Sequence, residues 1–324
     1  MYVKLLGMLI DFLKQNNIQY EENVPLKKKT WIKTGGIARL WITPENVKSL
    51  IKLGRYLYNE KKEFEIVGYT SNLFFTNDYN PQIIISTVKL KGVIETDTGF
   101  VCECGVQIAK FARERVEKGQ SGFSGMINLP GTIGAAVHNN AGCFGLTISD
   151  SVEAIEFLTV NGDVVRLNKD DLKYSHRSSA LKRKEVQGII LNIHLKKNAN
   201  STKECESKLA ICATQKRKAT QELPYRNLGS VYANLKYRLN LINVTCLILK
   251  KILQKIGIFK NYTRFFKVAL LTIYRYKYLD VYISDKDINT FIWHDEYAEE
   301  MFIDYQKFMN KVYKSPTLEI EIKK

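Results

Sequence analysis

The 324-residue chain has few of the residues that disulfide-rich, fibrous or zinc-dependent folds require. Its six cysteines are too few for a disulfide scaffold in a chain of this length, and no Cys-x-x-Cys pair or Cys/His zinc spacing occurs. The 6 prolines and 19 glycines exclude collagen-like and low-complexity sequence. Since 45% of the residues are apolar, a core of ordinary size can form. Because the zinc spacings are absent, we expect no metal site.

Long apolar runs are also absent. No stretch approaches the roughly 18 uninterrupted apolar residues of a membrane span. The first seventeen residues place several leucines on one helical face, but Asp11 and Lys14 interrupt what would be the apolar core of a signal peptide. No small-residue cleavage site follows, so we expect a cytoplasmic protein.

Acidic residues are scarce in one region only. Residues 211–280 hold 14 Lys or Arg against two acids, Glu222 and Asp280, and so contribute +12 of the formal net charge of +16. Evenly spread charge of this size would favour a nucleic-acid partner, whereas this charge is regional. Because no nucleic-acid fold signature accompanies it, we expect no nucleic-acid partner.

The hydrophobic pattern predicts an α+β protein in three parts, covering residues 1–80, 81–200 and 201–324. The first part reads as strand 38–42, a helix starting at Thr43-Pro44-Glu45, and strand 64–67. The second part reads as helix 108–118 among strands at 83–86, 92–96, 100–104, 154–159, 164–167 and 188–195, with an Asn-Gly hairpin turn at 160–163. The third part reads as helices 203–220 and 297–313 with strands 281–284, 290–293 and 317–322. No internal repeat is visible.

Two loops of small residues are the most informative features. Gly68–Asn72 follows the carboxyl end of a predicted strand, where ligands usually bind. Residues 129–142 are rich in Gly and Ala, which lets backbone N–H groups approach a pyrophosphate closely. A single loop of this kind is more often a buried turn, but two in one chain favour a dinucleotide clamp. Neither fits the GxGxxG or Walker spacing, which argues against NAD-type Rossmann and P-loop folds.

These loops resemble the UDP-N-acetylenolpyruvoylglucosamine reductase family, with order and spacing in agreement from about Met8 to Arg183. The matching motifs are Val24-Pro25-Leu26-Lys27-Lys28-Lys29-Thr30 before Gly35-Gly36, Val67-Gly68 with Ser71-Asn72, Gly125 with Leu129-Pro130-Gly131-Thr132-Ile133-Gly134, and Asn140-Ala141-Gly142. The resemblance implies a two-subdomain FAD-binding fold of the p-cresol methylhydroxylase type (1–80 and 81–200), followed by a smaller α+β substrate domain (201–324).

The resemblance also implies the cofactors and the residues that contact them. FAD would bind non-covalently, with NADPH as co-substrate. The implied FAD contacts are Gly68, Tyr69, Thr70, Ser71, Asn72, Pro130, Gly131, Thr132, Gly134, Ala135, Asn140, Ala141 and Gly142. Tyr69 and Thr70 stand where the family usually has glycines.

Three catalytic residues are implied in the same way. In His176-Arg177-Ser178-Ser179, where His replaces the family's Tyr, Arg177 would orient and polarise the enolpyruvyl carboxylate. In Gly229-Ser230-Val231-Tyr232, Ser230 would be the general acid. Glu321, near the carboxyl end, matches the family's acidic residue. The implied substrate contacts are Arg217, Gln221 and Asn289.

The activity implied is NADPH-dependent reduction of UDP-N-acetylglucosamine enolpyruvate to UDP-N-acetylmuramate, a step in peptidoglycan precursor synthesis. The sequence departs from the family pattern over residues 231–283. Two alternatives therefore stay open: a related FAD enzyme that acts on another nucleotide sugar in surface-polysaccharide synthesis, and a non-catalytic flavin- or membrane-binding descendant. We expect a monomer.

Within this divergent region, residues 247–259 form an amphipathic helix pattern. Ile248, Ile252, Ile256 and Phe259 make an apolar stripe, with Lys250, Lys251 and Lys255 on the other side. The commonest arrangement of such a helix packs the stripe into a core. The positive charge at 245–278 could instead steer an anionic nucleotide sugar, or rest on an anionic membrane surface.

Overall fold

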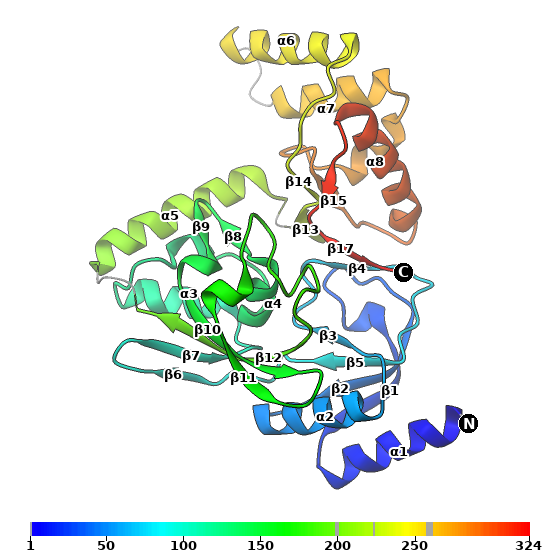
Figure 1. Ribbon diagram of the computed structural model, residues 1–324. Coiled ribbons are helices and arrows are strands. Elements are labelled where there is room, and N and C mark those ends of the chain that lie inside the picture. Colours follow the sequence, from blue (N-terminus) through cyan, green and yellow to red (C-terminus); the bar gives the residue numbers. More distant parts are fainter. Residues whose placement is uncertain (1, 198–200, 223, 257–261) are drawn as a thin grey trace. The chain divides into compact units, whose positions relative to one another are not determined.

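The computed structural model describes residues 2–197, 201–222, 224–256 and 262–324 (Figure 1). The chain forms two compact units, Met1–Ser71 with Asp78–Thr214, and Asn72–Asn77 with Gln215–Lys324. Both contain helices and strands, as the predicted α+β class requires. The functional boundaries predicted at residues 80 and 200 stay predictions.

The first unit begins with a four-stranded sheet in the order β1-β2-β5-β3. Strands β2 (Ile37–Thr43), β5 (Ile83–Ser86) and β3 (Glu65–Val67) are parallel, and β1 (Gln19–Pro25) is antiparallel to β2. Helix α1 (Tyr2–Gln15) precedes β1, and α2 (Val47–Asn59) connects β2 to β3. The predicted start of α2 at Thr43-Pro44-Glu45 is wrong, because the Asn46 side chain caps the helix by accepting from the Ser49 amide.

The second sheet of this unit is antiparallel, in the order β11-β10-β12-β7-β6. Its strands are β6 (Val93–Glu95), β7 (Gly99–Glu103), β10 (Val152–Thr159), β11 (Val164–Asn168) and β12 (Gly188–Lys196). The hairpin between β10 and β11 has Gly162 at φ +87°, as the Asn-Gly turn predicts. Helices α3 (Ile108–Glu117) and α4 (Ile133–Asn139) pack on this sheet, and the short strands β8 (Gly142–Cys143) and β9 (Leu146–Thr147) follow α4.

The two sheets share one hydrophobic core. Leu50 and Leu53 of α2 lie in the same buried cluster as Ile155 of β10 and Leu191 of β12. Helix α2 comes close to the second sheet at Gly54, where an added Cβ would lie 2.5 Å from a methyl group of Leu158. A larger residue at this position would push the helix away from the sheet.

The described residues of the second unit form three short strand pairs. Strand β13 (Asn227–Ser230) pairs with β15 (Thr290–Ile292), β14 (Tyr232–Ala233) with β16 (Thr317–Leu318), and β4 (Leu73–Phe75) with β17 (Glu321–Lys323). Its core is aromatic: Phe291 packs on Phe302 and Tyr305 of helix α8 (Ala298–Val312), at ring-centroid distances of 5.1 Å. Helix α5 (Lys203–Thr220) leads into this unit from the first.

Two strands predicted in this unit are wrong. Residues 281–284 are not a strand, because the 3-10 helix η5 (Lys277–Tyr282) runs into them and only Ile283 bridges to Phe291. The predicted strand 317–322 is split into β16 and β17 by a bend at Glu319 and Ile320. The two halves pair with different partners, which a single straight strand could not do.

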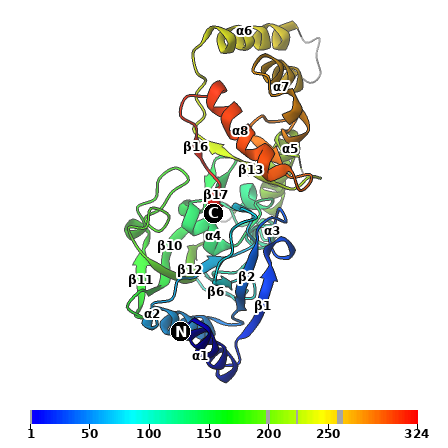
Figure 2. The same cartoon turned by 90° about the vertical axis from the view of Figure 1, so that its right-hand side faces the viewer.

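The divergent region forms helices α6 (Leu241–Ile256) and α7 (Tyr262–Ile273), which pack on each other (Figure 2). Phe259 of the predicted stripe lies outside the described residues, as does the side chain of Ile256. The core-packed interpretation of the stripe is wrong, because Ile248 and Ile252 are exposed. Within the described residues, no helix combines the length and apolarity needed to cross a bilayer.

Candidate active site

The two small-residue loops lie side by side in the first unit. A Cβ added to Gly68 would lie 2.7 Å from Thr132 Oγ1, and one added to Gly131 would lie 3.2 Å from Ser71 Oγ. Since real Cβ atoms do not approach other atoms as closely as 2.7 Å, Gly68 allows this packing. The structure thus brings together the two loops that the sequence predicts to form a clamp.

Gly131 is the glycine whose Cβ position is most open among those in the two loops. It has φ +119°, a conformation that only glycine adopts readily, and Ser71 Oγ is the sole described atom within 4 Å of an added Cβ outside its immediate neighbours. Gly134 and Gly142 differ, since their added Cβ atoms would meet Cys104 Cβ at 2.8 Å and Leu146 O at 2.5 Å. Protein packing therefore explains these two glycines. The Cβ position of the buried Gly131, in contrast, meets only the Ser71 hydroxyl.

Thr70 shows how a residue other than glycine fits the first loop. It has φ +56°, in the left-handed region that costs a non-glycine residue about 1 kcal/mol or more. Its buried hydroxyl accepts a hydrogen bond from the Trp31 amide at 2.8 Å. Thr70 therefore ties the first loop to the segment after the Lys-rich motif, which offsets the strained conformation.

Helix α4 begins and ends at predicted cofactor residues. The Thr132 hydroxyl accepts from the Ala135 amide at 3.2 Å, and Asn140 ends the helix in the left-handed conformation, φ +46°. Asn140 Nδ2 donates to the Ser175 carbonyl at 2.8 Å. In the described residues, the buried Oδ1 atoms of Asn139 and Asn140 have no hydrogen-bond partner, so both can accept from a ligand.

The turn that carries Arg177 is held against the end of α4 on both sides. Besides the bond from Asn140 to Ser175, the Ser179 hydroxyl donates to the His138 carbonyl at 2.6 Å. Ser175 and Ser178 exchange two backbone hydrogen bonds of 3.0 and 3.1 Å, and Arg177 between them has φ +54°. Arg177 is half-buried and His176 is exposed. A left-handed arginine that is fixed in this way is typical of functional sites.

Ser230 and Glu321 lie on adjacent backbone segments of the second unit. Ser230 ends β13 opposite Thr290, and the next residue, Val231, accepts a hydrogen bond from the Glu319 amide at 2.9 Å. Two residues later, the Glu321 amide donates to the Asn72 carbonyl at 3.0 Å. Both predicted catalytic side chains are half-buried. Arg177 belongs to the first unit.

Asn289 holds the backbone next to Ser230. Its Oδ1 accepts from the Tyr232 amide at 2.9 Å, its Nδ2 donates to the Tyr232 carbonyl at 2.8 Å, and its own carbonyl accepts from the Val231 amide at 2.8 Å. This buried side chain therefore fixes residues 231–232. Contact of Asn289 with a substrate stays a prediction.

The end of α5 is fixed by a network that the sequence patterns did not reveal. Lys286 Nζ donates to the carbonyls of Lys218 and Gln221 at 2.9 and 3.1 Å, and lies 3.6 Å from the Glu222 carboxylate. The Ser284 hydroxyl donates to Glu222 Oε1 at 3.2 Å. Glu222 therefore links α5 to the segment before β15.

This network places Gln221 next to the Ser230 loop. A Cβ added to Gly229, which has φ +73°, would lie 3.7 Å from Gln221 Nε2. Arg217, one turn earlier on α5, is half-buried. The second unit therefore places Gln221 beside the Ser230 loop and joins that loop to the segment that carries Glu321.

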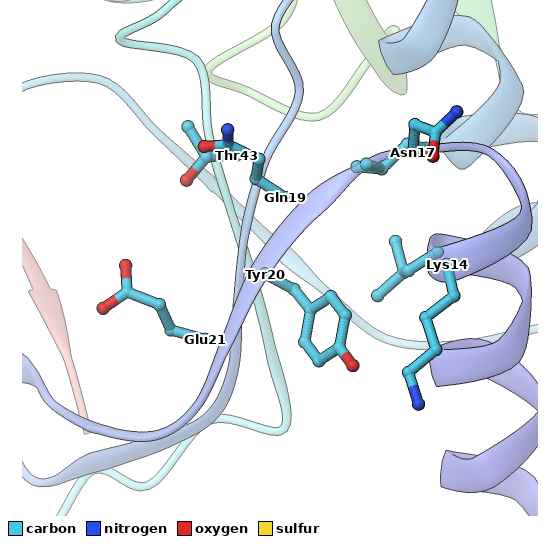
Figure 3. A pocket seen from close by; sticks show the side chains of 8 residues that line it. Lys14, Asn17, Gln19, Tyr20, Glu21 and Thr43 are labelled. Atoms are coloured by element: carbon cyan, nitrogen blue, oxygen red, sulfur yellow. The ribbon is translucent and has the colours of Figure 1, made fainter.

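A pocket of the first unit is lined by other residues. It has a volume of about 540 Å³ and lies between the end of α1 and β1, where Lys14, Asn17 and Tyr20 line it (Figure 3). None of its lining residues is a predicted site residue, and it is wide open to solvent. It gives no support to a second ligand site.

Comparison with known proteins gives consistent matches. Residues 38–168 match the model of the FAD binding domain family. The UDP-N-acetylenolpyruvoylglucosamine reductase of Caldicellulosiruptor bescii is 31% identical over 221 residues, which cover 68% of this chain and 70% of that protein. The reductase of the same name from Caldanaerobacter subterraneus is 30% identical over 228 residues, 70% of this chain and 74% of that one.

A solved structure agrees with these matches in its fold. The UDP-N-acetylenolpyruvylglucosamine reductase of Thermus caldophilus has a TM-score of 0.64 at 20% identity, and the match covers 94% of this chain and 98% of that one. Together the matches confirm the resemblance that the motifs indicate and the predicted FAD-binding α+β fold.

Proposed function

Because this chain belongs to the UDP-N-acetylenolpyruvoylglucosamine reductase family, we propose that it reduces UDP-N-acetylglucosamine enolpyruvate to UDP-N-acetylmuramate with NADPH as the reductant. The chain is an FAD-dependent oxidoreductase. The observation that carries the proposal is the pairing of the Ser230–Val231 segment with residues 319–321, since it gathers a hydroxyl and a carboxyl group in one unit. The reaction would supply a precursor of peptidoglycan.

The residues of the first unit fit a flavin dinucleotide. The Gly131 backbone, whose Cβ position meets only the Ser71 hydroxyl, would face the pyrophosphate together with that hydroxyl, since a pyrophosphate accepts hydrogen bonds from N–H and O–H groups. The unpartnered Oδ1 atoms of Asn139 and Asn140 would accept from hydroxyl or N–H groups of the flavin moiety. When bound, FAD supplies the hydride. We propose that it binds without a covalent link.

The chain's own residues would control charge and protons. The Arg177 guanidinium would form a bidentate pair with the enolpyruvyl carboxylate and draw electron density toward it as the terminal carbon gains hydride. The Ser230 hydroxyl would then give its proton to the adjacent carbon, which completes addition of H⁻ and H⁺ across the double bond. Glu321 would help to stabilise the charge that develops between these steps.

The nucleotide part of the substrate would meet the second unit. Arg217 and Gln221, both near the end of α5, would contact it, and Lys286 keeps that end in place. We propose that the enzyme acts in the cytoplasm as a monomer. Action on another nucleotide sugar, or loss of catalysis, is not favoured, because the relatives described above carry the same reductase name over two thirds of this chain.

Anaerobic reduction and reoxidation of the purified protein test the function. The protein should show a flavin spectrum, and acid precipitation should release all of the yellow colour into the supernatant. NADPH should bleach the flavin band, and UDP-N-acetylglucosamine enolpyruvate should restore it. UDP-N-acetylglucosamine, which lacks the double bond, is the control and should not restore it. Bleaching without recovery on adding the enolpyruvyl substrate would overturn the proposal.

A further inference from the structure

Helix α6 has its apolar face outward. Leu241, Ile248 and Ile252 are 84%, 54% and 46% exposed, and Val244 and Leu249 are exposed as well. Residues three, four or seven positions apart share one helix face, so these side chains form a stripe along nearly the whole helix. Leu239, just before the helix, is also exposed. A water-facing helix normally places such residues inward.

The inward side of α6 is held by hydrogen bonds of the buried Asn243. The buried Asn243 donates to the carbonyls of Arg238 and Val312 at 2.8 and 3.0 Å, and accepts from the Tyr274 hydroxyl at 2.9 Å. Lys250 lies 4.8 Å above the Phe266 ring of α7. Because these contacts fix the rotation of the helix, the apolar stripe cannot turn inward without breaking them.

The charge around this stripe is of one sign. No Asp or Glu occurs between Glu222 and Asp280, whereas eleven Lys or Arg residues do. Lys251 and Lys255 are exposed and lie three positions after Ile248 and Ile252, so they flank the stripe on one side. An apolar helix face bordered by lysines matches the interface of an anionic bilayer, where acyl chains meet negatively charged headgroups.

We propose that α6 docks this protein on anionic membrane surfaces, with Ile248 and Ile252 in the interface and Lys251 and Lys255 on the headgroups. Contact between two copies through this face is disfavoured, because each copy would bring lysines from a segment that has no acid to pair with them. The helix lies in the plane of the surface, as an apolar stripe with a charged flank requires.

Vesicle flotation of the full-length protein tests this proposal. The wild type should float with vesicles of 70% phosphatidylcholine and 30% phosphatidylglycerol, and not with phosphatidylcholine alone. Raising NaCl from 0.1 to 0.5 M should release it, since salt screens the lysine–headgroup attraction. The double variant Lys251→Gln/Lys255→Gln should bind about 30-fold more weakly, at roughly a fivefold loss for each lysine removed.

Matched variants on other helices test whether vesicle binding depends on this face of α6 or only on the number of exposed lysines and apolar residues. Lys48→Gln/Lys52→Gln removes two exposed lysines with the same spacing on α2, and should bind vesicles like the wild type. Ile248→Ser/Ile252→Ser should abolish flotation, whereas Leu209→Ser/Ile211→Ser, two exposed apolar residues of α5, should not. Circular dichroism and the flavin-to-protein absorbance ratio check that each variant is folded.

Three other results of these experiments would overturn the proposal. Wild-type protein that stays with the unbound fraction at 0.1 M NaCl would show that the face does not bind lipid. Equal flotation of the Ile248→Ser/Ile252→Ser variant would place binding elsewhere on the molecule. Dimers in light scattering that this variant converts to monomers, without vesicle binding by the wild type, would assign the stripe to contact between copies.

Discussion

The backbone of Asn72, the last residue of the first predicted flavin loop, pairs directly with that of Glu321. The Glu321 amide donates to the Asn72 carbonyl at 3.0 Å, and Asn72 Nδ2 donates to the Glu319 carbonyl at 3.3 Å. This bond directly precedes the parallel pairing of β4 with β17, in which Glu321 lies opposite Leu73. A segment that follows a flavin loop in sequence therefore supports the predicted acidic residue in space.

Replacing Asn72 tests this support. Asn72→Ala removes the side-chain bond to Glu319 and leaves the backbone pairing of β4 and β17 intact. We expect turnover to fall about tenfold, since misplacing a reacting group costs rate before it costs folding. Steady-state kinetics and the FAD content of the purified variant are the measurements. Asn80→Ala, which removes an exposed side-chain bond to the Ile37 amide, is the control. Loss of FAD with unchanged turnover of the remaining holoenzyme would contradict the expectation.

The Cβ position of Gly131, which meets only the Ser71 hydroxyl, gives a prediction about flavin binding. Gly131→Asp should abolish it, because a carboxylate would stand at the proposed pyrophosphate position and repel it. The left-handed conformation adds strain for any side chain, so Gly145→Asp is the matched control. Gly145 has φ +87° and open space around its Cβ position, but belongs to neither loop. Equal loss of FAD from both variants would show that strain, not the carboxylate position, is responsible.

Ser230 should affect only one half-reaction. Ser230→Ala should leave flavin reduction by NADPH nearly unchanged and slow reoxidation by the enolpyruvyl substrate by roughly 10²–10⁴-fold, the usual effect of a lost general acid. Anaerobic stopped-flow absorbance follows both steps separately. Ser284→Ala, which removes a hydroxyl from the α5 network, is a control for loss of packing. Similar damage to both half-reactions in Ser230→Ala would assign Ser230 a structural role.

The sequence predicted those elements whose patterns are local. Strands β5, β7, β10 and β12 and helix α3 lie within two residues of their predicted bounds, because alternating or helical apolar spacing reports burial directly. The adjacency of the two predicted flavin loops agrees with their glycine content. A close approach of two backbones leaves no room for a side chain and therefore requires glycine, and glycines can be read directly from the sequence.

Features that depend on distant contacts were not predictable in the same way. The bend at Glu319 and Ile320 arises because residues 317–318 pair with β14 and residues 321–323 with β4, and neither partner is local. The outward stripe of α6 follows from Asn243, whose buried amide bonds to Arg238 and Val312. A helical pattern gives the stripe but not the direction in which it faces.

Asp287 gives a prediction about pH and stability. Burial raises the pKa of its carboxyl, and the Asn289 amide and the Lys250 charge oppose this shift only in part. A raised carboxyl pKa means that ionisation destabilises the folded state at neutral pH. Asp287→Asn should therefore raise the melting temperature at pH 7. The gain should disappear below about pH 4, where the wild-type carboxyl is protonated in both states. A lower melting temperature at pH 7 would show that the charge on Asp287 stabilises the fold.

Lys286 gives a prediction that separates substrate binding from chemistry. It bonds two carbonyls at the end of α5 and pairs with Glu222, so Lys286→Met should loosen the helix end that carries Arg217 and Gln221. We expect KM for the nucleotide sugar to rise by about tenfold, the cost of roughly 1.4 kcal/mol of binding energy, while kcat changes less than about threefold. Flavin reduction by NADPH in the absence of the nucleotide sugar should be unchanged. Lys307→Met removes an exposed lysine that pairs with Asp304 on α8, and should leave all three quantities as in the wild type. A fall in kcat with KM unchanged would instead indicate that the α5 network acts on the reacting groups.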